Sequence, residues 1–152
     1  MIRYAPLFLL AACTSFPPES KSYLKLDYQA VRKMVQSATP KGSTVWMNGL
    51  NDSRPVESDE HSYLRVFAVQ TSDPLDRSRL RKAFTSRIER YGGKAKVDHE
   101  SDRGFTITYS AESRREEYTP VRKTITYELT GFVELTMKDP RTYEIVVREA
   151  KG

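Results

Sequence analysis

The sequence of 152 residues has one cysteine, two histidines and no apolar run long enough to cross a bilayer as a helix. A single cysteine excludes an intramolecular disulfide framework and a cysteine-based zinc finger. The two histidines, His61 and His99, are too few for a histidine-rich metal site, and their polar neighbours indicate surface imidazoles. A membrane-spanning helix needs about 20 consecutive apolar residues, which no segment supplies.

The sequence also lacks the motifs of common catalytic sites. It has no Gly-rich phosphate loop, no Gly-x-Ser-x-Gly nucleophile elbow and no His-Glu-x-x-His pair. The polar segment 51–61 contains Glu57, Asp59 and Glu60, but without the alternation of a calcium-binding EF-hand loop, and it predicts a solvated loop. We therefore expect no enzyme activity, no metal and no cofactor.

What is present is an aromatic-rich, basic chain of single-domain length. Nine Tyr, six Phe and one Trp argue against disorder and favour a β-rich core. Lys and Arg number 25 against 20 Asp and Glu, which gives a net charge of +5.

The N-terminus has the features of a bacterial export signal. Arg3 is the positive residue, and the apolar stretch from Leu7 to Ala12 is followed at once by Cys13. The residues Leu10-Ala11-Ala12-Cys13 resemble the lipobox of bacterial lipoproteins. That resemblance implies cleavage before Cys13, diacylglycerol on its thiol and acylation of its new amino group.

The lipobox predicts three parts: a signal peptide over residues 1–12, a lipidated tether over 13–22 and one domain over 23–152. Two or three acyl chains would hold the protein stably on a membrane, because each buried methylene contributes about 0.8 kcal/mol. In the enterobacterial sorting rule, aspartate after the lipidated cysteine retains a lipoprotein in the inner membrane. Thr14 in that place implies the outer membrane, facing the periplasm. Export from the cytoplasm also argues against nucleic acid as a partner.

Hydrophobic periodicity predicts an α+β fold with two helices. Apolar residues at helical spacing indicate a short helix from Leu26 to Ala38. The pair Asp73-Pro74 indicates the capped start of a second helix, which runs to Tyr91 and stops at Gly92-Gly93.

Alternating apolar residues predict strands over 43–50, 63–70, 95–98 and 105–111, with a β-α-β unit over 63–98. Both faces of residues 63–70 are largely apolar, which is typical of a central strand covered on two sides.

Residues 121–138 and 142–148 predict a long C-terminal hairpin with one wet face. Gly131 marks a bend in its first strand, and residues 138–141 form the turn. The charged segment 112–119 predicts a loop or an exposed hairpin end.

The order of these elements over residues 63–148 resembles that of small α/β outer-membrane lipoproteins. Such proteins include the lipoprotein partner of the lipopolysaccharide translocon, lipoprotein subunits of conjugation and type IV secretion machines, and activators of peptidoglycan synthases. The resemblance lies in element order, so it carries over no site residues. It implies a non-enzymatic structural or assembly subunit of a secretion, conjugation or pilus complex in the envelope.

The second predicted helix is the main charged feature, with six cations against Asp76 and Glu89. The cations are Arg77, Arg79, Arg81, Lys82, Arg87 and Arg90. Such a basic face predicts binding to lipopolysaccharide phosphates, peptidoglycan, lipid headgroups or an acidic protein. An ordinary solvated face is the alternative, because long cationic side chains also cover apolar surface.

The long hairpin is a second candidate interaction surface, since an unpaired strand edge can add to a neighbouring sheet. Its natural anchors at an interface would be Trp46, Tyr118, Phe132 and Tyr143. Packing of these aromatic side chains in the core is the alternative.

Overall fold

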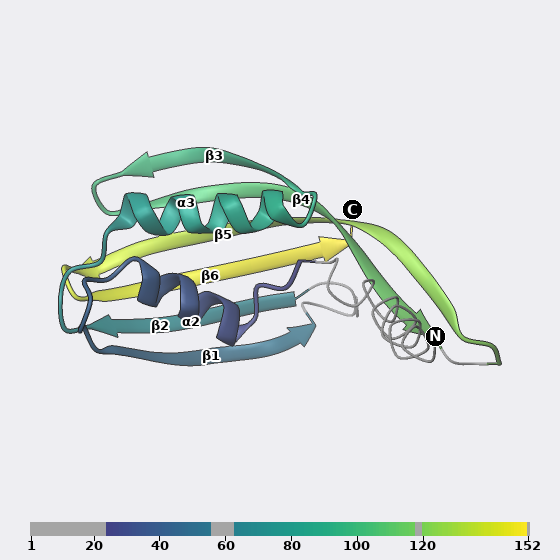
Figure 1. The fold of residues 1–152 in the computed structure, drawn as a ribbon, viewed down its shortest axis with the longest axis horizontal. Coiled ribbons are helices and arrows are strands. Elements are labelled where there is room, and N and C mark those ends of the chain that lie inside the picture. The colour runs from purple at the N-terminus through teal and green to yellow at the C-terminus, as the bar shows by residue number, and fades with distance from the viewer. Residues whose placement is uncertain (1–23, 56–62, 118–119, 152) are drawn as a thin grey trace, which may run out of the picture.

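The computed structural model describes residues 24–55, 63–117 and 120–151. This part of the chain contains two helices and six strands (Figure 1). In chain order they are α2 (Tyr28–Ser37), β1 (Val45–Pro55), β2 (Tyr63–Thr71), α3 (Arg77–Arg90), β3 (Lys94–Ser101), β4 (Gly104–Glu117), β5 (Lys123–Asp139) and β6 (Thr142–Lys151).

All six strands form one sheet in the order β1-β2-β6-β5-β4-β3, and every neighbouring pair is antiparallel. Both helices lie on the same face of the sheet and contact each other (Figure 1). The core lies between them and the sheet, where Phe84 of α3 meets Phe105 of β4 edge to face, with ring centroids 6.4 Å apart. The predicted α+β class is therefore confirmed.

The β-α-β unit predicted over residues 63–98 is present as a wide crossover. β2 and β3 run in the same direction and are joined through α3, but β6, β5 and β4 lie between them. Every other pair of sheet neighbours is consecutive in the chain. The β2–β6 pairing, from Tyr63↔Glu149 to Gln70↔Thr142, is thus the one long-range seam, and it joins the β1–β2 pair to the other four strands.

Helix α2 forms where the apolar spacing predicts it. The carboxylate of Asp27 caps the helix by accepting a hydrogen bond from the Ala30 amide at 2.9 Å. The helix ends at Ser37, three residues before Pro40, which cannot continue a helix. Its buried face consists of Ala30, Val31, Met34 and Val35.

The predicted cap of the second helix, Asp73, is wrong. Asp76 caps α3 by accepting from a first-turn amide at 3.1 Å, whereas the Asp73 carboxylate accepts from the Ser43 hydroxyl at 2.7 Å. Leu75 between them is buried, and its amide donates to the Tyr143 hydroxyl at 2.9 Å. These tertiary contacts keep residues 73–75 out of the helix.

The end of α3 follows the prediction. The last helical residue is Arg90, and Gly92 adopts a φ of 80°, a left-handed conformation that favours glycine. The buried face of the helix consists of Leu80, Phe84 and Ile88.

Strand β1 is longer than predicted, because residues 51–55 continue the strand instead of forming a loop. The pairing is irregular there, with Asn51 opposite Val66 and Arg54 opposite Leu64. An irregular edge strand tolerates the polar residues and the proline that a central strand would exclude. The acidic residues of the predicted loop and the adjacent histidine lie outside the described residues; they are Glu57, Asp59, Glu60 and His61.

The described residues cover β2 on one face only, so the predicted cover on two sides is not found among them. Phe67 and Val69 are buried beneath the helices. Leu64, Val66 and Ala68 point to the other face and are half-buried.

Strands β5 and β6 form the predicted C-terminal hairpin, paired from Leu129↔Lys151 to Asp139↔Thr142. β4 pairs with β5 as far as Glu117↔Lys123, beyond the ends of β3 and β6. Segment 112–117 is therefore one strand of a projecting two-stranded arm, which confirms the exposed hairpin end and excludes the loop (Figure 1).

Candidate functional site

The predicted lipidation site, Cys13, and the tether of residues 13–22 lie outside the described residues. Leu24, the first described residue, is already part of the core. Neither helix in the described ranges has the length and apolar character needed to span a membrane. The lipid anchor therefore stays a prediction from the sequence.

Two of the six predicted basic residues attach α3 to the end of β3. Arg77 donates to the carbonyl of Ser101, and Arg81 forms an ion pair with Glu100. Both contacts fix the first half of the helix against the sheet edge, so these two cations have structural partners.

Arg87 attaches the second half of the helix on its other side. Its Nε donates at 3.2 Å to the carbonyl of Lys25, just before α2, and its guanidinium lies 5.5 Å from the centroid of the Tyr91 ring. Arg87 therefore attaches α3 to the segment that precedes α2 and is also structural.

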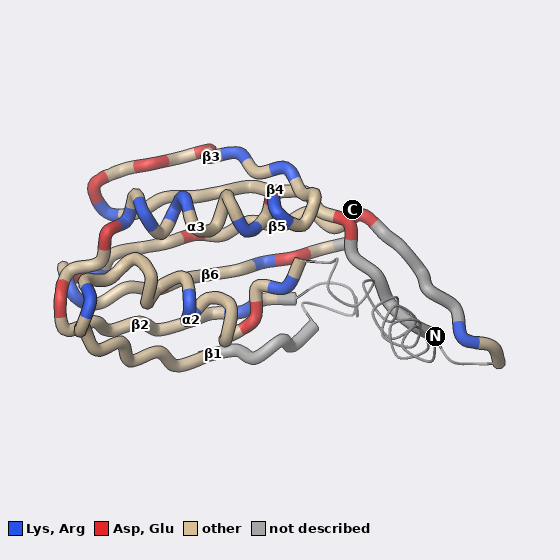
Figure 2. The backbone as a smooth tube through the Cα atoms, viewed as in Figure 1, with Lys and Arg blue, Asp and Glu red and all other residues tan. Residues whose placement is uncertain are grey.

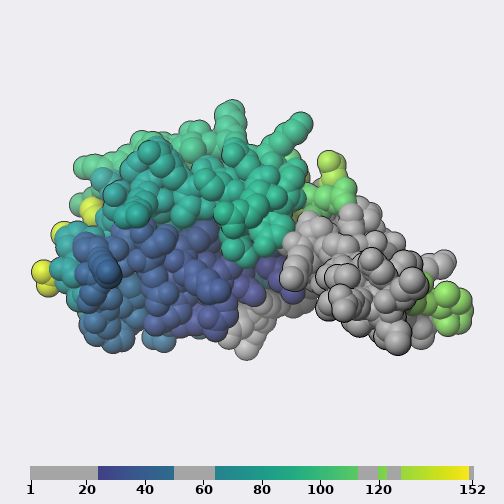
Figure 3. All heavy atoms as spheres, in the orientation of Figure 1, coloured from purple at the N-terminus to yellow at the C-terminus, as the bar shows by residue number. Residues whose placement is uncertain are grey.

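Arg79, Lys82 and Arg90 are exposed, and their side chains have no hydrogen bond or ion pair with any described residue. Their spacing places them on one side of α3, over about 16 Å at 1.5 Å per residue. Figure 2 shows the cations of α3, and the helices form a continuous surface in the space-filling view (Figure 3). The predicted six-residue basic face is thus reduced to a ridge of three residues, which we call the α3 ridge.

The sheet face that points away from the helices has an apolar centre, which we call the apolar strip. Its residues are Leu64, Val66, Ala68, Phe132 and Val146, all half-buried. Val66 lies opposite Val146, and exposed Arg148 lies between Leu64 and Phe132. No helix of the described chain covers this strip.

The four predicted aromatic anchors have different environments. Trp46 on β1 is 53% exposed, and Phe132 belongs to the apolar strip. Tyr143 is buried, where its hydroxyl accepts from the Leu75 amide and donates to the Pro140 carbonyl, so it packs in the core. Tyr118 lies outside the described residues.

The outer edge of β1 is partly occupied by side chains of α2. The Tyr28 hydroxyl donates to the Met47 carbonyl at 2.8 Å, and Arg32 donates to the Val45 carbonyl at 3.3 Å. These bonds use backbone acceptors that an added strand would need. On the β3 edge, Arg77 of α3 donates to the carbonyl of Ser101 at the end of the strand, and most of the side chains of β3 are exposed.

A buried polar network, absent from the sequence predictions, crosses the helix-facing side of the sheet. The Tyr109 hydroxyl donates to the Glu149 carboxylate at 2.8 Å, and Arg65 lies 3.5 Å from the same oxygen. Burial, followed by the negative charge and hydrogen bond of Glu149, raises the pKa of Tyr109 well above its ordinary value. The network joins three strands, β4, β6 and β2, because Tyr109 on β4 reaches across β5 to Glu149.

Gly131 on β5 makes this reach possible. A Cβ at this position would lie 2.5 Å from the Tyr109 ring and 2.8 Å from the Arg148 carbonyl. In the sequence, the signal for this site is the glycine within a long alternating strand. From that glycine we predicted a bend, not a space for a ring from the neighbouring strand.

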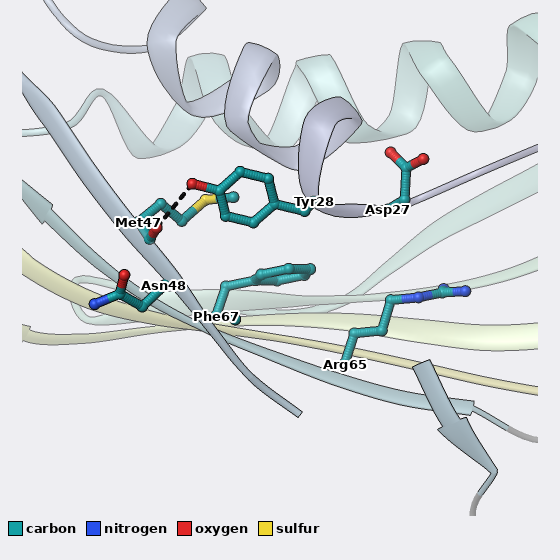
Figure 4. Close-up of a pocket in the computed structure, with 7 residues that line it drawn as sticks. Asp27, Tyr28, Met47, Asn48, Arg65 and Phe67 are labelled. Atoms are coloured by element: carbon teal, nitrogen blue, oxygen red, sulfur yellow. Dashed lines mark hydrogen bonds between the residues drawn. The ribbon is translucent and has the colours of Figure 1, made fainter. Parts of the chain in front are cut away.

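A cleft of about 440 Å³ lies between the start of α2 and strands β1 and β2 (Figure 4). The Tyr28 and Phe67 rings line it, and Asp27 and Arg65 lie at one end. Its polar groups already serve the fold: Asp27 caps α2, Tyr28 donates to a β1 carbonyl, and Arg65 pairs with Glu149. No buried side-chain polar atom in the described part lacks a hydrogen bond.

His99 is exposed on β3, and within the described ranges no three His, Cys, Asp or Glu side chains gather as metal ligands. No protein-family model, curated protein or solved structure matches the chain. The surfaces above must therefore be interpreted from their own chemistry.

Proposed function

We propose that this protein is a non-enzymatic lipoprotein of the outer membrane and a structural or assembly subunit of an envelope complex on the periplasmic side. The lipobox that ends at Cys13 supports the anchor, and the Pro-containing tether supports a domain held away from the lipid. The resemblance in element order supports a secretion, conjugation or pilus complex. The proposed activity is docking onto other envelope proteins.

The apolar strip is the observation that carries this proposal. Burying apolar surface is favourable by about 25 cal/mol per Å², so an apolar sheet centre that no described element covers favours a partner. Trp46, 53% exposed and opposite Gln70, extends the same face onto β1. Exposed tryptophan is enriched among the residues that dominate binding energy at interfaces.

The anchor is tested by mass spectrometry and fractionation of the native protein. We expect a mature chain that begins at acylated Cys13 and sediments with the outer membrane. The substitution Cys13→Ser should remove the protein from that fraction, whereas Thr14→Ala should leave it there. An unprocessed start with a free Cys13 thiol would refute the anchor.

Docking is tested by cross-linking and pull-down from detergent-solubilised outer membrane. The double variant Val66→Thr with Val146→Thr nearly preserves shape and strand propensity while it adds polarity, so it should lose the partners without unfolding. Val97→Thr with Val121→Thr is the matched control, because these valines are 37% and 65% exposed elsewhere. Recovery of the unaltered protein only as a monomer would contradict the proposal.

A second candidate function, binding of lipopolysaccharide or peptidoglycan, is favoured by the α3 ridge. Its cations have no partner among the described residues and are available to phosphate or carboxylate groups. Charge reversal by Arg79→Glu with Lys82→Glu should abolish binding and leave stability unchanged. Reversal at Arg77 and Arg81 should instead lower stability, because those residues attach α3. Unchanged ligand binding in the first variant would dispose of this candidate.

A further inference from the structure

Two adjacent rows of residues cross the sheet face that points away from the helices, from the edge strand β3 to β5. The rows contain two lysines, three hydroxyl side chains and one aromatic ring. They are Lys94–Ser110–Thr130 and Lys96–Thr108–Phe132. The same register continues onto β6 at Ala150 and at Arg148, which adds a third exposed cation.

A cleft of about 430 Å³ lies at these rows, lined by all of their residues except Phe132. The short side chains of Thr108, Ser110 and Thr130 leave a depression in the face. Lys94 and Lys96 stand beside it on the edge strand and are exposed. We call this site the Lys94–Lys96 cleft.

The lysines of the cleft are available to a ligand. Lys94 has no side-chain partner in the described chain, and the Nζ of Lys96 is 3.7 Å from the Oδ1 of Asp98. The Lys96 side chain is 81% exposed, and an ion pair of that exposure contributes little. Neither row contains an acid; acids lie in the rows on both sides, Glu134 in one and Glu112 with Glu128 in the other. Figure 2 shows the same separation along β3, with lysines at one end and acids at the other.

Lysines beside hydroxyl donors match the oxygen atoms of a phosphate group, which accept charge-assisted hydrogen bonds. The apolar side of the cleft adds a second requirement. Phe132 borders it and leads to Leu64, Val66 and Val146 of the apolar strip. A ligand that satisfies both regions carries a phosphate joined to an apolar group.

We propose that the Lys94–Lys96 cleft binds the phosphate headgroup of an anionic lipid, with Phe132 against the apolar part of the ligand. The site lies on the opposite side of the sheet from the α3 ridge, so the two are separable. Only the presence of lipid nearby rests on the proposed membrane location. The binding itself belongs to the folded domain.

The test uses the full chain with Cys13→Ser, so that no acyl chain contributes to binding. Sedimentation with vesicles of phosphatidylcholine mixed with phosphatidylglycerol is compared with phosphatidylcholine alone. We expect binding to the mixed vesicles, weakened roughly thirtyfold by Lys94→Ala with Lys96→Ala, or about five- to sixfold per lysine. Lys33→Ala with Lys41→Ala removes the same charge from exposed positions on α2 and just after it, and this variant should bind as the parent does.

A second variant separates coordination of the phosphate from general attraction of charge. Thr108→Val with Thr130→Val keeps the charge, the shape and the strand propensity but removes two hydroxyl donors. A hydrogen bond to a charged group predicts about tenfold weaker binding for this variant. Folding of every variant is checked by circular dichroism and urea unfolding.

Loss of binding in the Lys33 and Lys41 variant, with none in the Lys94 and Lys96 variant, would overturn the proposal. So would equal binding to phosphatidylcholine alone, or full binding by the threonine variant. Inorganic phosphate that binds the cleft as tightly as the vesicles do would replace the lipid with a free phosphate ligand. The tested chain carries no acyl group. Loss of vesicle binding would therefore not contradict the lipid anchor, and the absence of an anchor would not contradict vesicle binding.

Discussion

At Gly131 the sheet leaves space for a ring from the neighbouring strand. The Tyr109 ring lies 2.5 Å from the position that a Cβ would take, and its hydroxyl reaches Glu149 on the strand beyond. Apolar alternation predicted the strand correctly, since Leu129 and Val133 on either side of the glycine are buried. The direction of a ring from another strand depends on register, which alternation within one strand does not contain.

The substitution Gly131→Ala should lower the free energy of unfolding by about 3 kcal/mol, through overpacking and loss of the Tyr109–Glu149 bond. Urea denaturation measures this change. Tyr109→Phe provides the control, because its cost should become much smaller in the Gly131→Ala background. Fully additive costs would show that the glycine acts through something other than this ring.

Tyr109 also makes stability depend on pH. Burial and Glu149 raise its pKa in the folded state above the ordinary 10.0, so the folded chain retains a proton that the unfolded chain releases. The contribution is complete below pH 10.0 and is lost as the pH rises through the folded-state pKa. We expect the free energy of unfolding to fall more steeply as the pH rises above 10.0 in the unaltered protein than in Tyr109→Phe. Equal slopes in urea titrations would contradict this assignment.

At the scale of the element, α3 provides a matched pair of aspartates. Asp76 caps the helix, while Asp73 bonds the Ser43 hydroxyl at the surface. Asp76→Ala should therefore cost about 1 kcal/mol of unfolding free energy, and Asp73→Ala about 0.5 kcal/mol or less. Thermal or urea unfolding of both variants decides between the caps, and the reverse order would restore the Asp73-Pro74 cap.

The elements whose evidence is local could be predicted from the sequence. Both helices and the C-terminal hairpin follow their own periodicity, and Gly92 ends α3 as expected. The start of α3 could not be predicted from the sequence, because it depends on the burial of Leu75, which is a tertiary contact. The end of β1 could not either, because polar residues 51–55 are held in the sheet by pairing with β2.

The candidate sites divide in the same way. The lipobox at Cys13 is a local pattern, so the sequence alone supplies that prediction. Helical spacing also supplies the α3 ridge, but it could not show that Arg77, Arg81 and Arg87 bond to neighbouring segments. The apolar strip and the Lys94–Lys96 cleft join residues from different strands, so only the sheet register brings them together.

At the scale of the whole molecule, we expect the β2–β6 seam to form later in folding than the pairs of consecutive strands. Strand pairs that are consecutive in the chain close short loops, whereas the seam must bring distant segments together at a larger entropic cost. The strands on either side of the seam therefore have time to form before it closes.

Two buried valines test this order of folding. Val69 on β2 borders the seam and Val133 lies within the consecutive strands, and they are 1% and 0% exposed. Val133→Ala should mainly slow folding, whereas Val69→Ala should mainly speed unfolding. Stopped-flow chevron plots measure both rates, and a folding rate that falls equally in the two variants would place the seam in the folding nucleus.

The position of β6 has a consequence for a chain that is still being made or threaded through a membrane. β2 lacks its second neighbour until β6 has been synthesised, because β1 and β6 are the two strands beside it in the sheet. An arrested chain that stops before Thr142 would present β2 and β5 as two open edges to its surroundings. We therefore expect β2 to stay open to pairing with other strands until residues 142–151 occupy its edge, whatever the state of the two helices.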